Sequence, residues 1–458
     1  MSLIVSVSGI RGTIGGSVGS NLTPIDIVKF ATAYGSFIKQ KTSNPKIIIG
    51  RDGRISGPMV SDLVIRTLQA LGIDLIDAGW STTPSIEMAV ITEKLDGGII
   101  LTASHNPKEW NALKLLNAQG EFLSAQDGEE IVKLSQSDTV QFSQIDKLGK
   151  IRAWDQSVDS HIAQILQLPL VLKNKIQSKK FKVIVDCINS TGAIAIPKLM
   201  NALHCDFSLI NETVSGDFAH NPEPLPSHLT DLIQLCKKEK CIGIAIDPDV
   251  DRLALIDEQG NYFGEEYTLV AVADYILSKT PGNTVSNLSS SRALRDLTAS
   301  YNQSYSASAV GEAHVVKLMK ETNAVIGGEG NGGIIYPELH YGRDALVGIS
   351  LLLSYLAESN LNLSQLKSRY TQYFMYKDKM ELDPSLDYNQ LISYLINEYS
   401  SEQINTIDGL KIDFKDSWLH LRKSNTEPII RIYSEALSEP LAKDLVDQIK
   451  IKISDFRA

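Results

Sequence analysis

The sequence lacks most features of a secreted or membrane protein. Only four of its 458 residues are cysteine, and no two of them form a C-x-x-C pair. The longest apolar stretch, 345–357, contains one glycine and two serines and is too short to cross a bilayer, so it predicts a buried helix. Residues 1–12 lack the basic start of a signal peptide. We therefore expect a cytoplasmic protein with reduced thiols and no membrane contact.

Basic residues are also in short supply. The chain has 44 lysines and arginines against 54 aspartates and glutamates, a formal net charge of −10. This balance argues against a broad cationic surface for nucleic acid or anionic lipid. An anionic ligand would have to be bound by local donors instead. With 43% hydrophobic and 21% charged residues, the composition is that of a globular protein, long enough for about three domains.

Strand and helix patterns alternate along most of the chain. In the first third, apolar runs at 46–50, 72–79 and 98–102 alternate with helical periodicity at 58–71 and 84–95. The same alternation restarts twice, and after about residue 376 it gives way to polar helices and a few strands. We predict three related α/β domains with helices on both faces of mixed sheets, then a smaller C-terminal α+β domain. The predicted domains are 1–150, 151–257, 258–372 and 373–458.

Two polar motifs directly follow apolar strands, where ligand groups gather in open α/β sheets. The first, T-A-S-H-N-P, contains Ser104. The second, D-P-D-V-D-R, contains Asp247, Asp249 and Asp251 at alternate positions. Unpaired, these carboxylates would repel one another, and an oxygen-only ligand set favours Mg²⁺. The alternatives are a serine-capped turn for the first motif and a solvated acidic turn for the second.

Two later motifs have features of a sugar-phosphate site. Arg422 and Arg431 border the polar turn K-S-N-T-E-P, and guanidinium groups bind phosphate in bidentate fashion. The loop G-G-E-G-N-G-G allows a close backbone approach, and Glu329 within it can accept hydrogen bonds from sugar hydroxyls. A charged hairpin turn and a flexible turn are the alternatives. Arg11, Arg54 and Lys114 lie in or near other glycine-bearing or polar segments, where each alone is more typical of a solvated surface charge.

Together the four motifs resemble those of the α-D-phosphohexomutase superfamily, in the same order and over essentially the whole chain. The resemblance implies three α/β domains and a smaller fourth domain around one central cleft. It also implies an intramolecular phosphotransferase that interconverts hexose 6-phosphates and 1-phosphates through a phosphoserine and a 1,6-bisphosphate. The implied partners are a small sugar phosphate, Mg²⁺ and a hexose 1,6-bisphosphate activator, with no nucleic acid, in a monomer or homodimer.

The resemblance implies roles for the reacting groups. Ser104 would donate and recover the phosphoryl group, and Arg11 would steady the phosphoserine. Lys114 and His105 would serve proton transfer near the sugar oxygen, with Arg252 beside the transferring group. The metal ligands would be Ser104, Asp247, Asp249 and Asp251.

The resemblance also implies a binding set and a narrower substrate class. Glu329 and Asn331 would contact sugar hydroxyls, and a further sugar-contact loop is expected at 310–314. The phosphate that does not react would be held by Arg422, Ser424, Asn425, Thr426 and Arg431. These loops resemble a subgroup of phosphoglucosamine mutases and bifunctional phosphogluco/phosphomannomutases, although Asn331 replaces a serine found in many members. We predict a phosphoglucosamine mutase; the alternatives are glucose or mannose phosphate as substrate, a metal-dependent sugar phosphatase, and a non-catalytic sensor.

Overall fold

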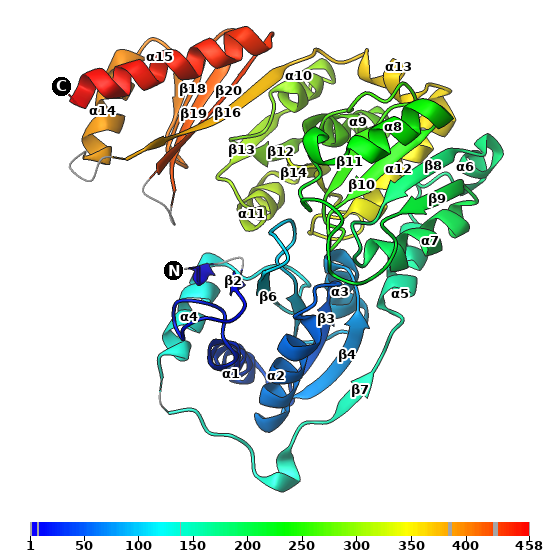
Figure 1. The fold of residues 1–458 in the computed structure, drawn as a ribbon, viewed down its shortest axis with the longest axis vertical. Helices are drawn as coiled ribbons and strands as arrows, with labels where there is room; N and C mark the ends of the chain where they lie inside the picture. Colours follow the sequence, from blue (N-terminus) through cyan, green and yellow to red (C-terminus); the bar gives the residue numbers. More distant parts are fainter. Residues whose placement is uncertain (1, 7–8, 138, 383–386, 425–428, 458) are drawn as a thin grey trace.

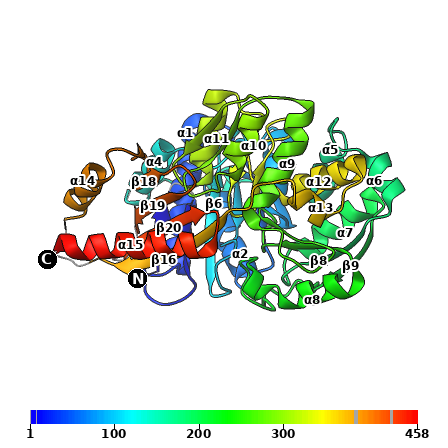
Figure 2. The same ribbon diagram turned by 90° about the horizontal axis from the view of Figure 1, so that it is seen from above.

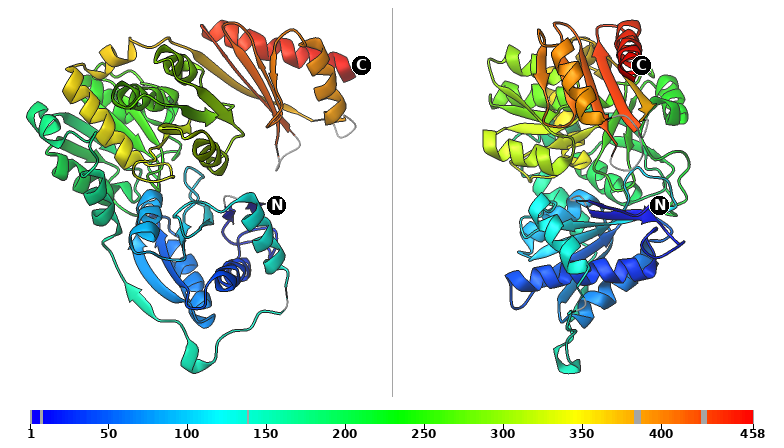
Figure 3. Two further views of the ribbon diagram at one scale, coloured as in Figure 1. Left: turned by 180° about the vertical axis from the view of Figure 1, so that it is seen from behind. Right: turned by 90° about the vertical axis from the view of Figure 1, so that its left-hand side faces the viewer.

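A computed structural model describes residues 2–6, 9–137, 139–382, 387–424 and 429–457. The chain builds four sheets, one after another (Figure 1). We call the surrounding parts unit I (4–153), unit II (157–256), unit III (265–367) and unit IV (374–457). The ribbon follows an arc with units I and IV at its two ends, as Figure 3 shows from two further sides. Seen from above, the helices of unit II and those of unit IV lie at opposite sides (Figure 2).

Unit I has a mixed seven-stranded sheet in the order β1-β2-β6-β5-β3-β4-β7. Ile47 and Ile49 of β3 face the core that contains α1, α2 and α4, whereas Ile48 faces α3 on the other side. This covering of both faces follows from the two-residue period of a strand. The strands are β1 (Ile4–Ser6), β2 (Gly9–Thr13), β3 (Lys46–Arg51), β4 (Asp74–Trp80), β5 (Gly97–Leu101), β6 (Trp110–Leu116) and β7 (Ile151–Ala153). The helices are α1 (Pro24–Lys41), α2 (Gly57–Ala70), α3 (Thr83–Thr92), α4 (Ala125–Ser135) and the 3-10 turn η1 (Ile145–Lys147).

Units II and III each have a four-stranded sheet, in the orders β11-β10-β8-β9 and β13-β12-β14-β15. In both sheets three strands are parallel and one edge strand is antiparallel. The strands are β8 (Lys182–Asp186), β9 (Asp206–Ile210), β10 (Ile242–Ile246), β11 (Leu253–Ile256), β12 (Thr284–Asn287), β13 (Tyr305–Ser308), β14 (Ile326–Glu329) and β15 (Gly333–Ile335). The helices are α5 (Ser157–Ile165), α6 (Lys173–Lys179), α7 (Gly192–Leu203), α8 (Thr230–Glu239), α9 (Glu265–Lys279), α10 (Ala293–Ser300), α11 (Glu312–Thr322), α12 (Ala345–Ser359), α13 (Leu363–Lys367) and the turn η2 (Pro226–His228).

One apolar core runs through units II and III without a break. It includes Val183 and Ile244 of the unit II sheet, Leu269 of α9 and Leu351 of α12. The predicted buried helix at 345–357 is confirmed as α12, because each of those residues is buried. Within the described residues, no helix has both the length and the apolar character needed to cross a bilayer.

Unit IV is a five-stranded antiparallel sheet in the order β16-β20-β19-β18-β17. Leu391 of α14 and Val446 of α15 belong to the core on one sheet face. The elements are β16 (Phe374–Glu381), α14 (Tyr388–Glu398), β17 (Gln403–Asn405), β18 (Leu410–Asp413), β19 (Trp418–Lys423), β20 (Ile429–Ala436) and α15 (Glu439–Arg457). The predicted fold class, with mixed α/β sheets and a smaller α+β end, is confirmed. The sequence analysis did not predict β6 or α1, although Thr23 and Asp26 form a capping box at the start of α1.

Candidate active site

The serine motif follows β5, the central strand of the unit I sheet. Ser104 has a left-handed backbone with φ of 49°, and its N–H donates to Thr102 Oγ1 at 2.9 Å. Its Oγ donates to Asp247 Oδ2 at 2.5 Å, and His105 Nδ1 lies 3.5 Å from the same Oγ. The structure therefore brings the predicted serine and the predicted metal loop together, across 143 residues of sequence.

A buried arginine holds the serine loop in place. Arg54 is 1% exposed, and its Nε lies 3.1 Å from the buried Asp52 Oδ2. Its guanidinium donates at 2.5–2.8 Å to the carbonyl oxygens of Ser104, Asn106, Pro107 and Trp110. The prediction that this arginine is a solvated surface charge was wrong, because four carbonyl oxygens and a carboxylate replace water around it.

Replacing Arg54 with alanine is expected to lower the free energy of unfolding by about 3–5 kcal/mol, since Asp52 would be left as an unpaired buried charge. We also expect kcat to fall about 10²-fold as the serine loop loses its anchors. Urea unfolding and steady-state kinetics measure the two effects. The control is Arg51→Ala, which removes the neighbouring guanidinium near the Trp80 ring and should cost about 1 kcal/mol or less. Equal losses of stability and of kcat in the two variants would contradict the anchoring role of Arg54.

The acidic motif forms the turn between β10 and the antiparallel β11. Val250 takes a left-handed φ of 64°, and Asp247 Oδ1 accepts the N–H groups of Asp251 and Arg252 at 3.1 Å. Asp247, Asp249 and Asp251 are fully buried, and each offers an oxygen within 4.8 Å of the others. The turn therefore gathers three carboxylates in one buried place.

The charges of this trio fit a divalent cation. Among the described residues, Asp249 Oδ1 and Asp251 Oδ1 are buried without a hydrogen-bond partner. Burial raises the pKa of Asp247 well above its ordinary value, and the carboxylates of Asp251 and Asp249 raise it further. A hard cation with oxygen ligands would offset this repulsion. The acidic trio can therefore bind a metal ion.

The side chain of Lys114, on β6, contacts carboxylates of the same trio. Its Nζ donates to Asp249 Oδ2 at 2.6 Å and to Asp251 Oδ2 at 3.3 Å. Burial acts to lower the pKa of Lys114, but these two carboxylates outweigh burial and raise it. Thr83 at the start of α3 also donates to Asp249, from its Oγ1 at 2.5 Å and its N–H at 2.9 Å. Unit I therefore holds the metal loop of unit II directly.

Arginine charges also act on the surroundings of Ser104, alongside the carboxylates of the acidic trio. Arg252 Nε is buried, lies 4.0 Å from Asp247 Oδ2, and has no hydrogen-bond partner among the described residues. Burial and the charge of Arg252 lower the pKa of His105 to about 2. Burial lowers the pKa of Arg11, and the charges of Arg252 and of Arg343 in unit III lower it further. The charge of Arg252 would attract a negatively charged group on the serine.

The predicted sugar loop joins β14 to β15. Glu329 is 5% exposed, and its Oε1 accepts hydrogen bonds from Asn287 Nδ2 at 2.9 Å and from the Gly311 N–H at 3.2 Å. Asn331 Oδ1 accepts the N–H of Gly333 at 3.2 Å. Glu329 thus lies at the carboxyl end of β14, fixed by groups from two neighbouring segments.

The sequence analysis missed Arg343, which connects these loops. Its Nη2 lies 2.7 Å from Asp251 Oδ2, its Nη1 2.8 Å from Glu329 Oε2, and its Nε 2.8 Å from Glu312 Oε2. Burial raises the pKa of Glu312 to about 7, although the charge of Arg343 acts to lower it. In the expected loop 310–314, Glu312 is buried at this site, whereas the His314 side chain is exposed. The sequence did offer one signal for Arg343: this arginine stands directly before Asp344, which caps the long apolar helix α12.

The predicted phosphate site lies on unit IV. Arg422 on β19 and Arg431 on β20 are cross-strand partners, and Lys379 on β16 is the other partner of Arg431. Cross-strand partners share a sheet face, so three cations stand in a row. Arg422 Nε also lies 2.9 Å from Asp408 Oδ2.

The rest of the predicted phosphate turn is only partly described. The N–H of Ser424 donates to the Ile429 carbonyl at 2.9 Å. Asn425 and Thr426 lie outside the described residues. In the part of the chain that the structure describes, the ion pair of Arg422 stays within unit IV and does not join the Ser104 loop. Units I, II and III thus bring the serine, metal and sugar loops together. Unit IV meets this group through Asp408, whose Oδ2 lies 2.9 Å from Arg422 Nε and accepts the N–H of Val310 at 3.0 Å.

Four consecutive stretches of the chain match the domains of one protein family. Residues 3–141, 159–260 and 264–373 match the alpha/beta/alpha domains I, II and III of phosphoglucomutase/phosphomannomutase. Residues 377–452 match the C-terminal domain of the same family. The chain belongs to the phosphoglucomutase/phosphomannomutase family. Its predicted membership of the α-D-phosphohexomutase superfamily is confirmed.

Named relatives of this family align over nearly the full chain. A phosphoglucosamine/phosphogalactosamine mutase of Sulfurisphaera tokodaii is 32% identical, covering 98% of this chain and 99% of the relative. A phosphoglucomutase/phosphomannomutase of Thermococcus kodakarensis is also 32% identical, covering 98% and 97%. A crystal structure of a family protein from Burkholderia thailandensis has a TM-score of 0.84 at 24% identity, covering 98% of this chain and 96% of that one. The whole four-part fold is therefore that of the family.

Proposed function

We propose that this phosphohexomutase interconverts glucosamine 6-phosphate and glucosamine 1-phosphate, with Ser104 as the phosphorylated residue. The observation that carries the proposal is the 2.5 Å hydrogen bond from Ser104 Oγ to Asp247, within a buried acidic trio and beside arginines. Glucosamine is proposed because the Sulfurisphaera tokodaii relative, and one from Methanopyrus kandleri at 30% identity, are named for it. The Thermococcus kodakarensis name supports glucose or mannose phosphate as the alternative.

The proposed reaction has two phosphoryl transfers. In the first, the Oγ–P bond of phosphorylated Ser104 breaks and a new O–P bond forms on the free hydroxyl of the sugar monophosphate. The sugar hydroxyl loses its proton as its new O–P bond forms, and the departing Ser104 Oγ takes up a proton. We assign this proton transfer to His105, which lies next to Oγ, and to Lys114, while Arg252 balances charge on the moving group. The 1,6-bisphosphate then returns its other phosphoryl group to Ser104, and the proton goes back to the sugar oxygen.

We propose Mg²⁺ as the resident cation, held by Asp247, Asp249, Asp251 and the serine oxygen. When bound there, Mg²⁺ supplies positive charge that stabilises the transferring phosphoryl group. We further propose a hexose 1,6-bisphosphate activator, because it can restore the phosphoserine after premature dissociation. A cytoplasmic location is supported by the four cysteines, which are all free and buried.

A coupled assay on glucosamine, glucose and mannose phosphates at equal concentration tests the proposal, with and without the matching bisphosphate. We expect the largest kcat/KM for glucosamine phosphate and stimulation by the bisphosphate. A larger value for glucose or mannose phosphate would replace the sugar but keep the reaction. Release of inorganic phosphate without isomer formation would instead establish the sugar phosphatase.

Arg422→Ala is expected to raise KM about tenfold with a smaller change in kcat, because the guanidinium would bind the phosphate that does not react. Lys423→Ala is the matched control: it removes the next cation along β19, which lies near the Tyr388 ring on the helix-covered side. Steady-state kinetics on both variants separates the two. An unchanged KM for Arg422→Ala would give this arginine another role.

A further inference from the structure

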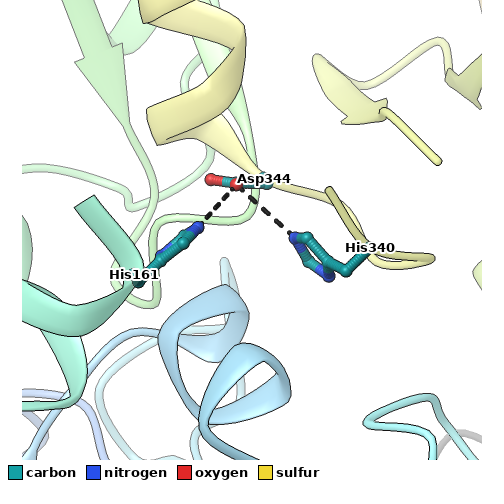
Figure 4. Close-up of side chains that lie close together, drawn as sticks. All are labelled: His161, His340 and Asp344. Atoms are coloured by element: carbon teal, nitrogen blue, oxygen red, sulfur yellow. Dashed lines mark hydrogen bonds and ion pairs between the residues drawn. The ribbon is translucent and has the colours of Figure 1, made fainter. Parts of the chain in front are cut away.

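A second cluster of metal-ligating side chains lies behind the metal loop. His161 on α5 and His340 in the segment before α12 both point toward Asp344, as Figure 4 shows. His161 Nε2 lies 2.9 Å, and His340 Nε2 3.5 Å, from the same oxygen, Asp344 Oδ2. The other oxygen, Asp344 Oδ1, caps α12 by accepting the N–H groups of Leu346 and Val347. Only Oδ2 is therefore available to the imidazoles.

The cluster is buried and incompletely satisfied. His161, His340, Asp344 and the neighbouring Glu87 are at most 4% exposed. Among the described residues, neither ring nitrogen of His340 and neither carboxylate oxygen of Glu87 has a hydrogen-bond partner. Buried polar atoms without partners are rare in folded proteins. These atoms point to a ligand that the surrounding protein does not replace.

Each imidazole has a polar group at its outer nitrogen. Ser85 Oγ lies 3.1 Å from His161 Nδ1, and Glu87 Oε2 lies 3.5 Å from His340 Nδ1; both partners are on α3. Metal-binding histidines usually have such an outer partner, which fixes the tautomer and directs the free nitrogen to the metal. Here both Nε2 atoms are directed toward Asp344 Oδ2.

The spacing and charge fit a transition-metal ion. His161, His340 and Asp344 offer one atom each within 4.8 Å of one another, and ligands of tetrahedral zinc lie about 3.3 Å apart. Neutral imidazole nitrogens are common ligands of transition metals. A divalent ion would also neutralise the carboxylates of Asp344 and Glu87. A nitrogen-rich set of this kind suits Zn²⁺ and not Mg²⁺.

We propose that His161 Nε2, His340 Nε2 and Asp344 Oδ2 bind a structural Zn²⁺-class ion, separate from the cation of the acidic trio. The ligands come from units II and III, and the outer partners Ser85 and Glu87 come from unit I. The ion would therefore link three units at one buried point. The bound ion would also hold Asp344 in position, and Asp344 is the neighbour in sequence of Arg343, which contacts the metal loop.

Co²⁺ titration of the chelator-treated full chain tests the site. Excess Mg²⁺ is added first to occupy the acidic trio, and Co²⁺ binding is followed by visible absorption and elemental analysis. We expect one Co²⁺ per chain with a tetrahedral spectrum, displaced by Zn²⁺. His340→Gln should weaken Co²⁺ binding by at least about 100-fold, and Glu87→Gln about 10- to 100-fold.

Asp247→Asn is the matched control, because it alters the acidic trio and should leave the Co²⁺ spectrum unchanged. Loss of the signal in Asp247→Asn but not in His340→Gln would overturn the proposal. Absence of a tetrahedral Co²⁺ spectrum in the wild-type chain would overturn it as well, whether or not the His340 variant folds. This metal readout is independent of the proposed sugar and of turnover, so its failure would leave the proposed function intact.

Discussion

Ser104→Ala is expected to lower mutase activity by about 10⁴-fold or more, because no other group can take up the phosphoryl group in its place. The variant should still fold, since Ser104 contributes its N–H and carbonyl, both retained by alanine, to the loop contacts with Thr102 and Arg54. Intact-mass analysis after incubation with bisphosphate should show an added mass of about 80 Da in the wild-type chain and none in the variant.

Ser227→Ala, an exposed serine of η2, is the control for this experiment and should keep both activity and the mass adduct. Peptide mapping then locates the phosphate on the wild-type chain. Full turnover by Ser104→Ala, or an adduct that persists in it, would remove Ser104 from the reaction.

Asp247→Asn is expected to reduce activity by about 10³-fold or more while increasing stability in buffer without divalent cations. The amide oxygen can still accept the N–H groups of Asp251 and Arg252, so the turn should keep its shape. One of three buried, mutually repelling carboxylates is gone, and it is burial together with this repulsion that raises the pKa of Asp247.

Thermal unfolding with and without Mg²⁺ separates these effects. Mg²⁺ should raise the Tm of the wild-type chain and have a smaller effect on Asp247→Asn. Asp231→Asn, which removes an exposed carboxylate from α8, should behave like the wild type. An equal Mg²⁺ effect on all three chains would mean that the acidic trio is not the Mg²⁺ site.

The motifs that were predictable from the sequence share a physical origin. Ser104 and Asp247 both follow apolar strands, and polar residues after buried strands gather at one edge of an α/β sheet. Strand patterns therefore predict that each motif lies at the carboxyl edge of its own sheet. That the two edges meet was implied only by the family resemblance. The glycines around Glu329 were informative for a similar reason, since they mark backbone that other groups approach closely.

Arg54 and Arg343 were not predictable in the same way. A single arginine in a polar loop is usually solvated, and its burial depends on acceptors contributed by distant segments. For Arg54 these acceptors lie about 50 residues later, in the serine loop. For Arg343 they come from Asp251, Glu312 and Glu329, in three separate segments of the chain. Tertiary packing decides which acceptors such an arginine meets, and no periodic pattern in the local sequence indicates that packing.

The continuous core of units II and III sets which parts of the enzyme can move. Separating these two units would expose the buried side chains of α9 and α12, so they form a rigid frame. Unit IV instead meets unit III through polar contacts, such as His420 Nδ1 with Ser289 Oγ at 3.0 Å and Lys411 Nζ with the Leu288 carbonyl at 2.7 Å. Water can replace contacts of this kind at little cost. We therefore expect any movement of unit IV to turn on the segment between α13 and β16, and such a movement would shift Arg422 and Arg431, the cations proposed to bind phosphate, relative to Ser104.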